Sequence, residues 1–350
     1  METIIRTLDI NRICEEIIDE ASVVLHRGGM VAFPTETVYG LGADALDEKA
    51  SLKIYQAKGR PSDNPLIVHI SNKEQLYRLV EEVPENAEKL MEEFWPGPLT
   101  MIFKKSSIVP RGTTGGLDTV AVRMPNHPVA LRLIEKSGVV IAAPSANTSG
   151  RPSPTTAAHV KEDLSGKIDM ILDGGQVGIG IESTIVDVTS MVPVILRPGY
   201  ITKEMMEKVI EKVEIDKAIL GPVSEDIKPK APGMKYRHYA PKAQLTMFSG
   251  KIEKVVEHIN TETQKNIAQG KRVGIIASEE TKDKYKSGNI LIIGARHDED
   301  TIAHNLYAIL RQFDDVGVDI IYGETFDEDG LGQAIMNRLL KAAGYHVEEV

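Results

Sequence analysis

The sequence predicts a two-domain α/β protein, and three observations support this. The length of 350 residues suits two domains of ordinary size. Short apolar runs typical of strands alternate with segments of helical periodicity, first over residues 1–205 and again over residues 244–350. Residues 206–243 between them include a stretch rich in proline and lysine, without apolar periodicity. We therefore expect a larger α/β domain, a linker and a smaller parallel α/β domain.

The first part consists of short apolar runs bounded by glycine or proline, and of amphipathic segments that end at such residues. We expect helices over residues 47–58, 85–95 and 127–138. We expect strands over residues 28–34, 65–70, 99–103, 118–125, 139–147, 169–175, 182–189 and 193–199. Residues 33–45, FPTETVYGLGADA, indicate by themselves a tight turn followed by a capped helix.

The second part alternates strands with helices. We expect strands over residues 245–248, 272–277, 289–294 and 318–323. We expect helices from residue 251, over residues 300–314 and over residues 331–344. Strands that alternate with helices in this way are typical of a parallel sheet.

The composition excludes several classes of protein. The formal net charge is −10, so no strongly basic surface indicates nucleic-acid binding. A single cysteine, Cys14, excludes a disulfide framework and a multi-cysteine zinc site. Charges interrupt the N-terminal residues every few positions, and no apolar run approaches the length of a membrane span. We expect a cytoplasmic protein that does not enter a membrane.

The common catalytic motifs are absent from the sequence. It contains no G-x-x-x-x-G-K-[ST], no H-E-x-x-H and no G-x-S-x-G. The glycine-rich residues 174–180, GGQVGIG, do not have the spacing of a dinucleotide-binding motif. A metallohydrolase or a serine hydrolase is therefore disfavoured, and no metal ligands are predicted.

The segment KGRPSDNPLIVHI, residues 58–70, carries two cations at the entrance to a predicted strand. Lys58 and Arg60 flank a glycine, and two prolines stiffen the turn that follows. Cations on such a loop can meet phosphate oxygens without first ordering a floppy segment. Two solvated cations explain a single turn equally well. His69, within the apolar run, is by itself more often a core histidine than a catalyst.

Further polar side chains follow other predicted strands. Arg123 lies in an apolar strand, where a buried guanidinium needs a partner such as a ligand carboxylate. Residues 142–156, AAPSANTSGRPSPTT, place hydroxyls, an amide and a guanidinium after a strand, which suits an anion-binding surface. A plain serine-rich loop is the alternative. Ser183 and Arg197 also lie at strand ends. Together these segments favour a nucleotide-using enzyme that works by positioning and charge stabilisation.

Seven segments, in order, resemble the YrdC-like domain: PTETVYGLGADA, KGRPSDNPLIVHI, WPGPLT, VAVRMPNHP, APSANTSGRPSPT, GIESTIVD and LRPG. With the following PGMKYRHYAPKA and the second α/β domain, the chain resembles the two-domain form of the threonylcarbamoyl-AMP synthase family. The resemblance implies an open, twisted, mixed sheet with helices, joined to a Rossmann-like parallel domain. It also implies that L-threonine, bicarbonate (as the source of CO2) and ATP give L-threonylcarbamoyl-adenylate, pyrophosphate and water. Other proteins would then use the adenylate to form threonylcarbamoyladenosine in tRNA.

The resemblance also implies roles for particular residues. The residues around L-threonine would be Thr35, His69, Arg123, Ala143 and Ser183. The residues around ATP would be Lys58, Ser62, Asn64, Thr119, Ser145, Asn147, Ser153, Arg197 and Tyr236. As a mechanism, we expect a threonine carbamate to attack the α-phosphorus of ATP. Lys58 and Arg60 would be the catalytic cations, aided by Mg²⁺ that enters with ATP.

Residues 235–241, KYRHYAP, are a candidate lid, because the adenylate is a mixed anhydride that needs protection from water. A passive tether is the alternative. Two other functions stay open from the residues alone. One is an RNA-binding or ribosome-maturation module, against which the net acidity argues. The other is an enzyme that handles carbamoyl phosphate and does not need threonine.

Overall fold

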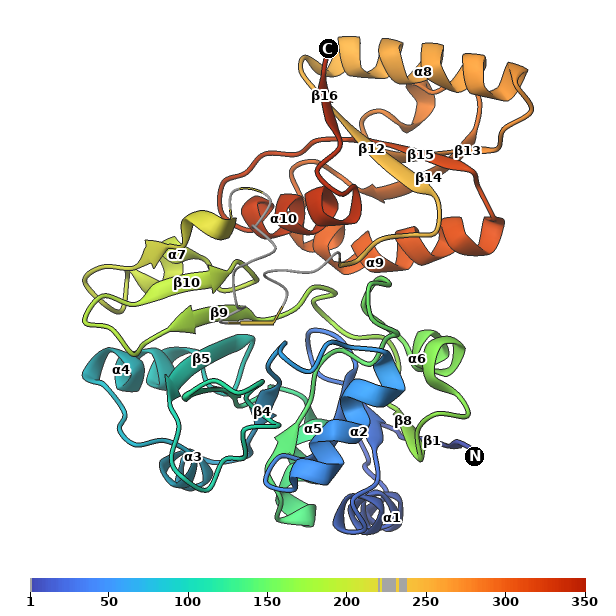
Figure 1. Ribbon diagram of the computed structural model, residues 1–350. Coiled ribbons are helices and arrows are strands. Elements are labelled where there is room, and N and C mark those ends of the chain that lie inside the picture. The colour runs from blue at the N-terminus through green and yellow to red at the C-terminus, as the bar shows by residue number, and fades with distance from the viewer. Residues whose placement is uncertain (1, 220, 222–230, 233–237) are drawn as a thin grey trace. The chain divides into compact units, whose positions relative to one another are not determined.

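The computed structural model of the protein describes residues 2–219, 221, 231–232 and 238–350. The chain divides into two compact units (Figure 1). Unit 1 comprises Met1–Ser149 and Ser153–Lys235, and unit 2 comprises Gly150–Pro152 and Tyr236–Val350. Unit 1 therefore continues past residue 205, where we expected the linker to begin.

Unit 1 is built on one mixed sheet with 11 strands among the described residues, in the order β1-β8-β2-β3-β7-β4-β6-β5-β9-β10-β11. Parallel pairs such as β4 with β6 occur beside antiparallel pairs such as β5 with β6, so the predicted mixed sheet is confirmed. The strands are β1 (Ile4–Thr7), β2 (Val31–Phe33), β3 (Gly40–Asp44), β4 (Ile67–His69), β5 (Leu99–Lys104), β6 (Thr119–Arg123), β7 (Ile141–Ala142), β8 (Met170–Asp173), β9 (Thr184–Asp187), β10 (Val194–Arg197) and β11 (Glu214–Ile215).

The helices of unit 1 include the three that we predicted and others that we did not. They are α1 (Glu15–His26), α2 (Glu48–Lys58), α3 (Lys73–Leu79), α4 (Glu85–Phe94), α5 (Pro128–Ser137), α6 (Ala157–Leu164) and α7 (Lys203–Met206), with a 3-10 turn at Lys217–Ile219. Helix α2 begins where the Asp47 side chain accepts the N–H of Lys49, and it ends at Gly59, whose φ of 62° is left-handed. This end places Lys58 in the last turn of the helix.

Residues 40–44 form strand β3, within the segment where we expected a tight turn, and the capped helix that we expected after this segment is α2. β3 pairs antiparallel with β2, and Gly42 lies opposite Val31. A Cβ atom on Gly42 would lie 2.6 Å from Ile141 Cγ2 and 2.7 Å from Phe33 Cε1. The glycine is therefore required by close packing within the sheet, and we had interpreted it as a turn residue.

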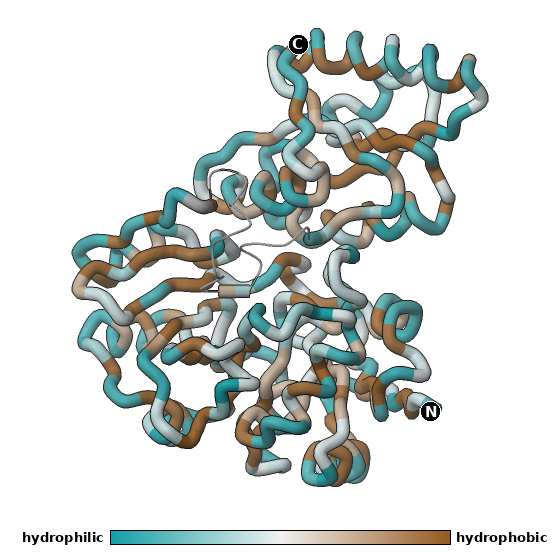
Figure 2. The backbone as a smooth tube through the Cα atoms, in the orientation of Figure 1, coloured by the Kyte–Doolittle hydropathy of each residue, from teal (hydrophilic) through white to brown (hydrophobic). Residues whose placement is uncertain are grey.

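Unit 2 contains a 5-stranded sheet among its described residues, in the order β14-β13-β15-β12-β16, and each pair is parallel. The strands are β12 (Gln244–Ser249), β13 (Val273–Ser278), β14 (Asn289–Gly294), β15 (Ile320–Glu324) and β16 (Val347–Glu349). The helices are α8 (Ile252–Ala268), α9 (Glu299–Val316) and α10 (Gly332–Ala342), with a 3-10 turn at Lys282–Lys284. Helix α8 covers one face of this sheet, and α9 and α10 cover the other (Figure 1). The hydrophobic stretches of the backbone follow the strands between these layers (Figure 2). The predicted parallel α/β domain is confirmed.

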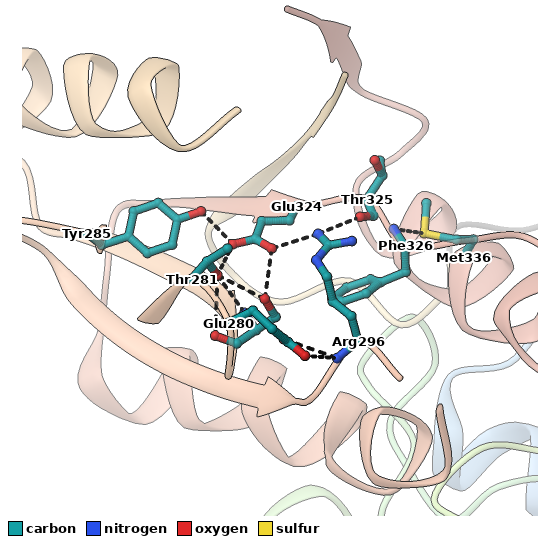
Figure 3. A network of polar contacts seen from close by, with 9 residues as sticks. Glu280, Thr281, Tyr285, Arg296, Glu324, Thr325, Phe326 and Met336 are labelled. Carbon is teal, nitrogen blue, oxygen red and sulfur yellow. Dashed lines mark hydrogen bonds and ion pairs between the residues drawn. The ribbon is translucent and has the colours of Figure 1, made fainter. Parts of the chain in front are cut away.

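A buried polar network lies at the carboxyl end of this parallel sheet (Figure 3). Glu324, the last residue of β15, is fully buried, and its carboxylate accepts hydrogen bonds from Thr281 Oγ1, from Tyr285 OH at 2.6 Å and from Arg296 Nη2 at 2.7 Å. Ser278, at the end of the neighbouring β13, donates to the same carboxylate at 3.3 Å. Because its charge is met by several donors, Glu324 holds the loops after β13 and β14 to β15.

Replacing Glu324 by glutamine should lower the free energy of unfolding of unit 2 by about 2–3 kcal/mol, because the hydrogen bonds lose a charged acceptor. Tyr285→Phe is the matched control, since it removes a single donor and should cost about 1 kcal/mol. Urea unfolding combined with hydrogen exchange of the β13 and β15 amides measures both losses. Equal losses in the two variants would contradict a special role for the carboxylate.

Candidate active site

The residues predicted around threonine lie where β4, β6, β5 and β9 are neighbours in the sheet. His69 and Arg123 are register partners at the ends of β4 and β6. On the other side of Arg123, its register partner is Thr100 of β5. The hydroxyl of Thr100 lies 2.8 Å from that of Ser183, the residue before β9. The sheet therefore brings side chains far apart in sequence into one row.

Thr35 and Ala143 join this row through hydrogen bonds. Thr35 Oγ1 lies 2.9 Å from Thr37 Oγ1, which accepts a hydrogen bond from Arg123 Nη1 at 3.0 Å. Ala143, just past β7, donates its N–H to the carbonyl of Ile67 in β4 at 2.8 Å. All five residues predicted around threonine thus lie in one connected part of unit 1. Their contact with threonine stays a prediction.

Arg123 is the central charge of this patch. Its side chain is 4% exposed, and its Nε donates to the carbonyl of Gly97 at 3.3 Å. Its Nη2 lies 2.7 Å from Oε1 of Glu36, which is 14% exposed. Burying a guanidinium requires a counter-charge, and Glu36 supplies it. We had expected a ligand carboxylate as the partner of Arg123, and sequence reasoning did not find this internal one.

His69 is buried beside Arg123. Burial, together with the positive charge of Arg123, lowers the pKa of His69 to about 3. Its Nδ1 lies 3.1 Å from the carbonyl oxygen of Ile67, and its ring contacts Phe33 edge-on. The imidazole is therefore neutral at physiological pH, which suits a side chain that shapes a pocket and not one that shuttles protons.

Replacing His69 by glutamine should weaken the pH dependence of stability in acid. Below pH 6.5 the unfolded chain binds a proton on His69 that the folded protein does not bind until about pH 3, so the wild type loses stability as the pH falls through this window. At pH 4.5 the wild type should have lost about 2–3 kcal/mol more than the variant, taking about 1.4 kcal/mol per pH unit for one proton. Chemical unfolding from pH 7.5 to 4.5 measures this difference. Parallel profiles would show that His69 does not contribute.

Lys58 reaches from the end of α2 into the loop after β7. Its ammonium donates to the carbonyl of Ser145, to the carbonyl of Asn147 at 2.5 Å and to Asn147 Oδ1 at 3.4 Å. The hydroxyl of Ser145 also donates to Asn147 Oδ1 at 2.5 Å. Lys58 is 2% exposed, so the solvated cation that we considered as the alternative is wrong, whereas its contact with ATP phosphates stays a prediction. In this structure the ammonium of Lys58 holds the serine-rich loop against α2.

Arg197 and Ser153 complete the polar part of the site. Arg197, at the end of β10, donates from Nη2 to the carbonyl of Ser183 at 2.9 Å and to its hydroxyl at 3.1 Å. Through Ser183, Arg197 is therefore connected to the row that contains Arg123. Ser153 Oγ donates to Oε1 of the buried Glu182 at 2.5 Å. Glu182 and Thr100 are two more residues of this region that sequence reasoning missed.

The other predicted ATP and catalytic residues lie around the turn before β4 and at the start of β6. Arg60 donates to the carbonyls of Asn64 and Pro65 at 3.3 and 3.1 Å, and so it holds its own turn closed. Ser62 is exposed in this turn. Thr119 begins β6, at the opposite end from Arg123.

Part of the predicted site lies outside the described residues. Tyr236 is one of these, and so are Lys235 and Arg237 of the candidate lid. Arg151, which we had grouped with the anion-binding hydroxyls, belongs to unit 2, where its Nη2 lies 3.5 Å from Oδ2 of Asp314 in α9. Asp314 is thus an anionic neighbour of Arg151, and the binding of a ligand anion by this residue stays a prediction.

The described residues contain no group of three or more His, Cys, Asp or Glu side chains placed to hold a metal ion. None of the helices in the described ranges is long and apolar enough to cross a membrane.

Comparison with known proteins agrees with this architecture. A family model of the Sua5/YciO/YrdC type, described as telomere recombination, matches residues 23–199. A second model, the C-terminal domain of threonylcarbamoyl-AMP synthase, matches residues 201–344. The threonylcarbamoyl-AMP synthase of Pyrococcus abyssi is 52% identical over 339 residues, which cover 97% of each chain. That of Bacillus subtilis is 51% identical over 332 residues, covering 94% of each chain.

A solved structure shows the same fold. The crystal structure of Pyrococcus abyssi Sua5 complexed with L-threonine superposes with a TM-score of 0.94 and 51% sequence identity. The superposition covers 99% of this chain and 100% of that chain. Fold and site thus define a YrdC-like unit joined to a parallel α/β unit. The chain belongs to the threonylcarbamoyl-AMP synthase family. Membership makes it an enzyme of the nucleotidyltransferase type, as predicted, and gives no support to the RNA-binding alternative.

Proposed function

We propose that the protein forms L-threonylcarbamoyl-adenylate from L-threonine, bicarbonate and ATP, with release of pyrophosphate. The observation that carries the proposal is the buried row of polar side chains centred on Arg123, in a chain of this family. The relative crystallised with L-threonine supports threonine as the amino acid. The product is an activated mixed anhydride, which tRNA-threonylcarbamoyl-transfer proteins would consume.

Arg123 binds the carboxylate of threonine in this proposal. Its guanidinium is held in place by Gly97 and Thr37, so little side-chain entropy is lost when a carboxylate arrives. Neutral His69 forms one wall of the pocket, and Thr35 and Ser183 offer hydroxyls to the remaining polar groups of the amino acid.

Lys58 stabilises the charge that develops on the α-phosphate of ATP. Its ammonium lies at the loop of Ser145 and Asn147, so the predicted ATP-binding side chains of this loop are close to the cation. Arg60, in the neighbouring turn, adds positive charge. Because the described residues present no cluster of metal ligands, we expect Mg²⁺ to enter with ATP, held mainly by phosphate oxygens and water.

Pyrophosphate release by the purified protein tests the proposal. The protein is incubated with ATP and Mg²⁺, with both threonine and bicarbonate, with each alone and with neither. Release that requires both co-substrates is the expected result. Release that is indifferent to threonine, or none at all, would overturn the proposed reaction.

A further inference from the structure

The ion pair of Glu36 and Arg123 is buried but poorly hydrogen-bonded. Arg123 Nη2 and Glu36 Oε1 lie 2.7 Å apart, with side chains that are 4% and 14% exposed. Nevertheless, neither oxygen of Glu36, nor Nη2 of Arg123, makes a hydrogen bond to any described residue. Arg123 Nη2 and Glu36 Oε1 are therefore in contact as charges without the geometry of a hydrogen bond, and Glu36 Oε2 is buried without a hydrogen-bond partner.

A buried ion pair without hydrogen bonds destabilises the folded protein unless another group supplies the missing bonds. Buried polar atoms in folded proteins nearly always have a hydrogen-bond partner, and a carboxylate accepts several such bonds. His127 lies close enough to feel the charge of Glu36, but it does not supply a counter-charge. Burial lowers the pKa of His127, although the charge of Glu36 opposes this shift, so the imidazole stays neutral and does not balance the carboxylate. The Nδ1 atom of His127 also has no hydrogen-bond partner among the described residues.

The backbone at Glu36 is fixed, so its side chain can change partner without movement of the loop. The carbonyl of Glu36 accepts the N–H of Ile179 at 2.8 Å, and that of Thr37 accepts the N–H of Gly180 at 3.1 Å. On the other side, Gly97 and Thr37 hold the Nε and Nη1 atoms of Arg123. The two charges are therefore presented side by side from rigid supports, and Nη2 of Arg123 lies next to Oε1 of Glu36.

An adjacent carboxylate and guanidinium complement a zwitterion. An α-amino acid carries an ammonium, which only donates hydrogen bonds, and a carboxylate, which only accepts them, on the same carbon. We propose that Glu36 receives the ammonium group of the amino-acid substrate while Arg123 receives its carboxylate. This inference rests on the proposed function and deepens it. Glu36 is then a binding residue that selects α-amino acids over carboxylic acids without an amine.

Titration calorimetry with two ligands tests the inference on the full chain. The ligands are L-threonine and 3-hydroxybutanoate, which is threonine without the amine. The wild type should bind threonine about 10- to 100-fold more tightly, the range expected for one charge-assisted contact. In Glu36→Gln this preference should fall to within about threefold, whereas 3-hydroxybutanoate should bind at least as well as before, because Arg123 loses its internal competitor. Binding of this analogue also shows that the variant is folded.

Two further variants complete the design. Glu135→Gln makes the same change of charge at a side chain 64% exposed, and it should keep the wild-type preference. Glu36→Asp keeps the carboxylate and should also keep a preference for threonine, even if Glu36→Gln does not fold. A wild-type preference in Glu36→Gln, or its loss in Glu36→Asp, would overturn the role of Glu36. Failure of the proposed function is distinguishable, because the wild type itself would then not bind threonine.

Discussion

Arg123→Lys should raise the KM for threonine by about 100-fold or more and leave the KM for ATP nearly unchanged. Lysine keeps the positive charge but has no planar fork, so it cannot bond to Gly97, to Thr37 and to a substrate carboxylate at the same time. The substitution removes two charge-assisted hydrogen bonds to the carboxylate, each worth about 1.5–3 kcal/mol. The binding free energy of threonine should therefore weaken by about 3 kcal/mol or more. Because the charge is retained, Glu36 is not left as an uncompensated buried carboxylate.

Steady-state pyrophosphate release, with threonine and ATP varied separately, measures these two constants. Arg132→Lys is the matched control, because Arg132 makes a bidentate pair with Glu15 at 2.8 and 2.7 Å on the surface of unit 1. It should change neither KM. A threonine KM within threefold of the wild type in Arg123→Lys would show that the guanidinium does not bind the carboxylate.

The strands beside the site were predictable because each is a short, apolar run that ends at a polar residue. β4 ends at His69 and β6 at Arg123, and the predicted runs contain both strands. β3 was not predictable in the same way. Its two glycines favour a turn when the sequence is considered alone, whereas here they allow the close approach of Phe33 and Ile141.

The partners of the predicted site residues were less accessible from the sequence. The sequence indicated Lys58 as a cation of the site, but it did not indicate that its ammonium bonds to carbonyl oxygens of a loop nearly 90 positions away in the chain. Glu36 was visible in PTET, yet nothing local indicates that it meets Arg123 from a distant strand. Sequence motifs identify which side chains carry the chemistry, whereas pairing between distant segments decides which charge lies next to which.

Lys58→Met should lower kcat by about 10²- to 10³-fold, the largest effect that we expect in the ATP-binding part of the site. Removing one donor that stabilises transition-state charge costs about 3 kcal/mol, and the rigid position of Lys58 at the end of α2 makes it such a donor. Methionine keeps the length and apolar stem of the side chain. The carbonyls of Ser145 and Asn147 lose a cationic partner, so we also expect a loss of about 1–3 kcal/mol in stability.

Lys53→Met is the matched control for the loss of a cationic donor from α2. Lys53 lies on the same helix as Lys58 and also donates to a backbone carbonyl, that of Gly28 at 2.5 Å. Lys53 is exposed, and its replacement should leave kcat within about twofold of the wild type. Single-turnover pyrophosphate release at saturating ATP isolates the chemical step from ATP binding. If Lys58→Met loses stability but keeps its single-turnover rate, then Lys58 only anchors the loop, and the charge on the α-phosphate is stabilised by another cation.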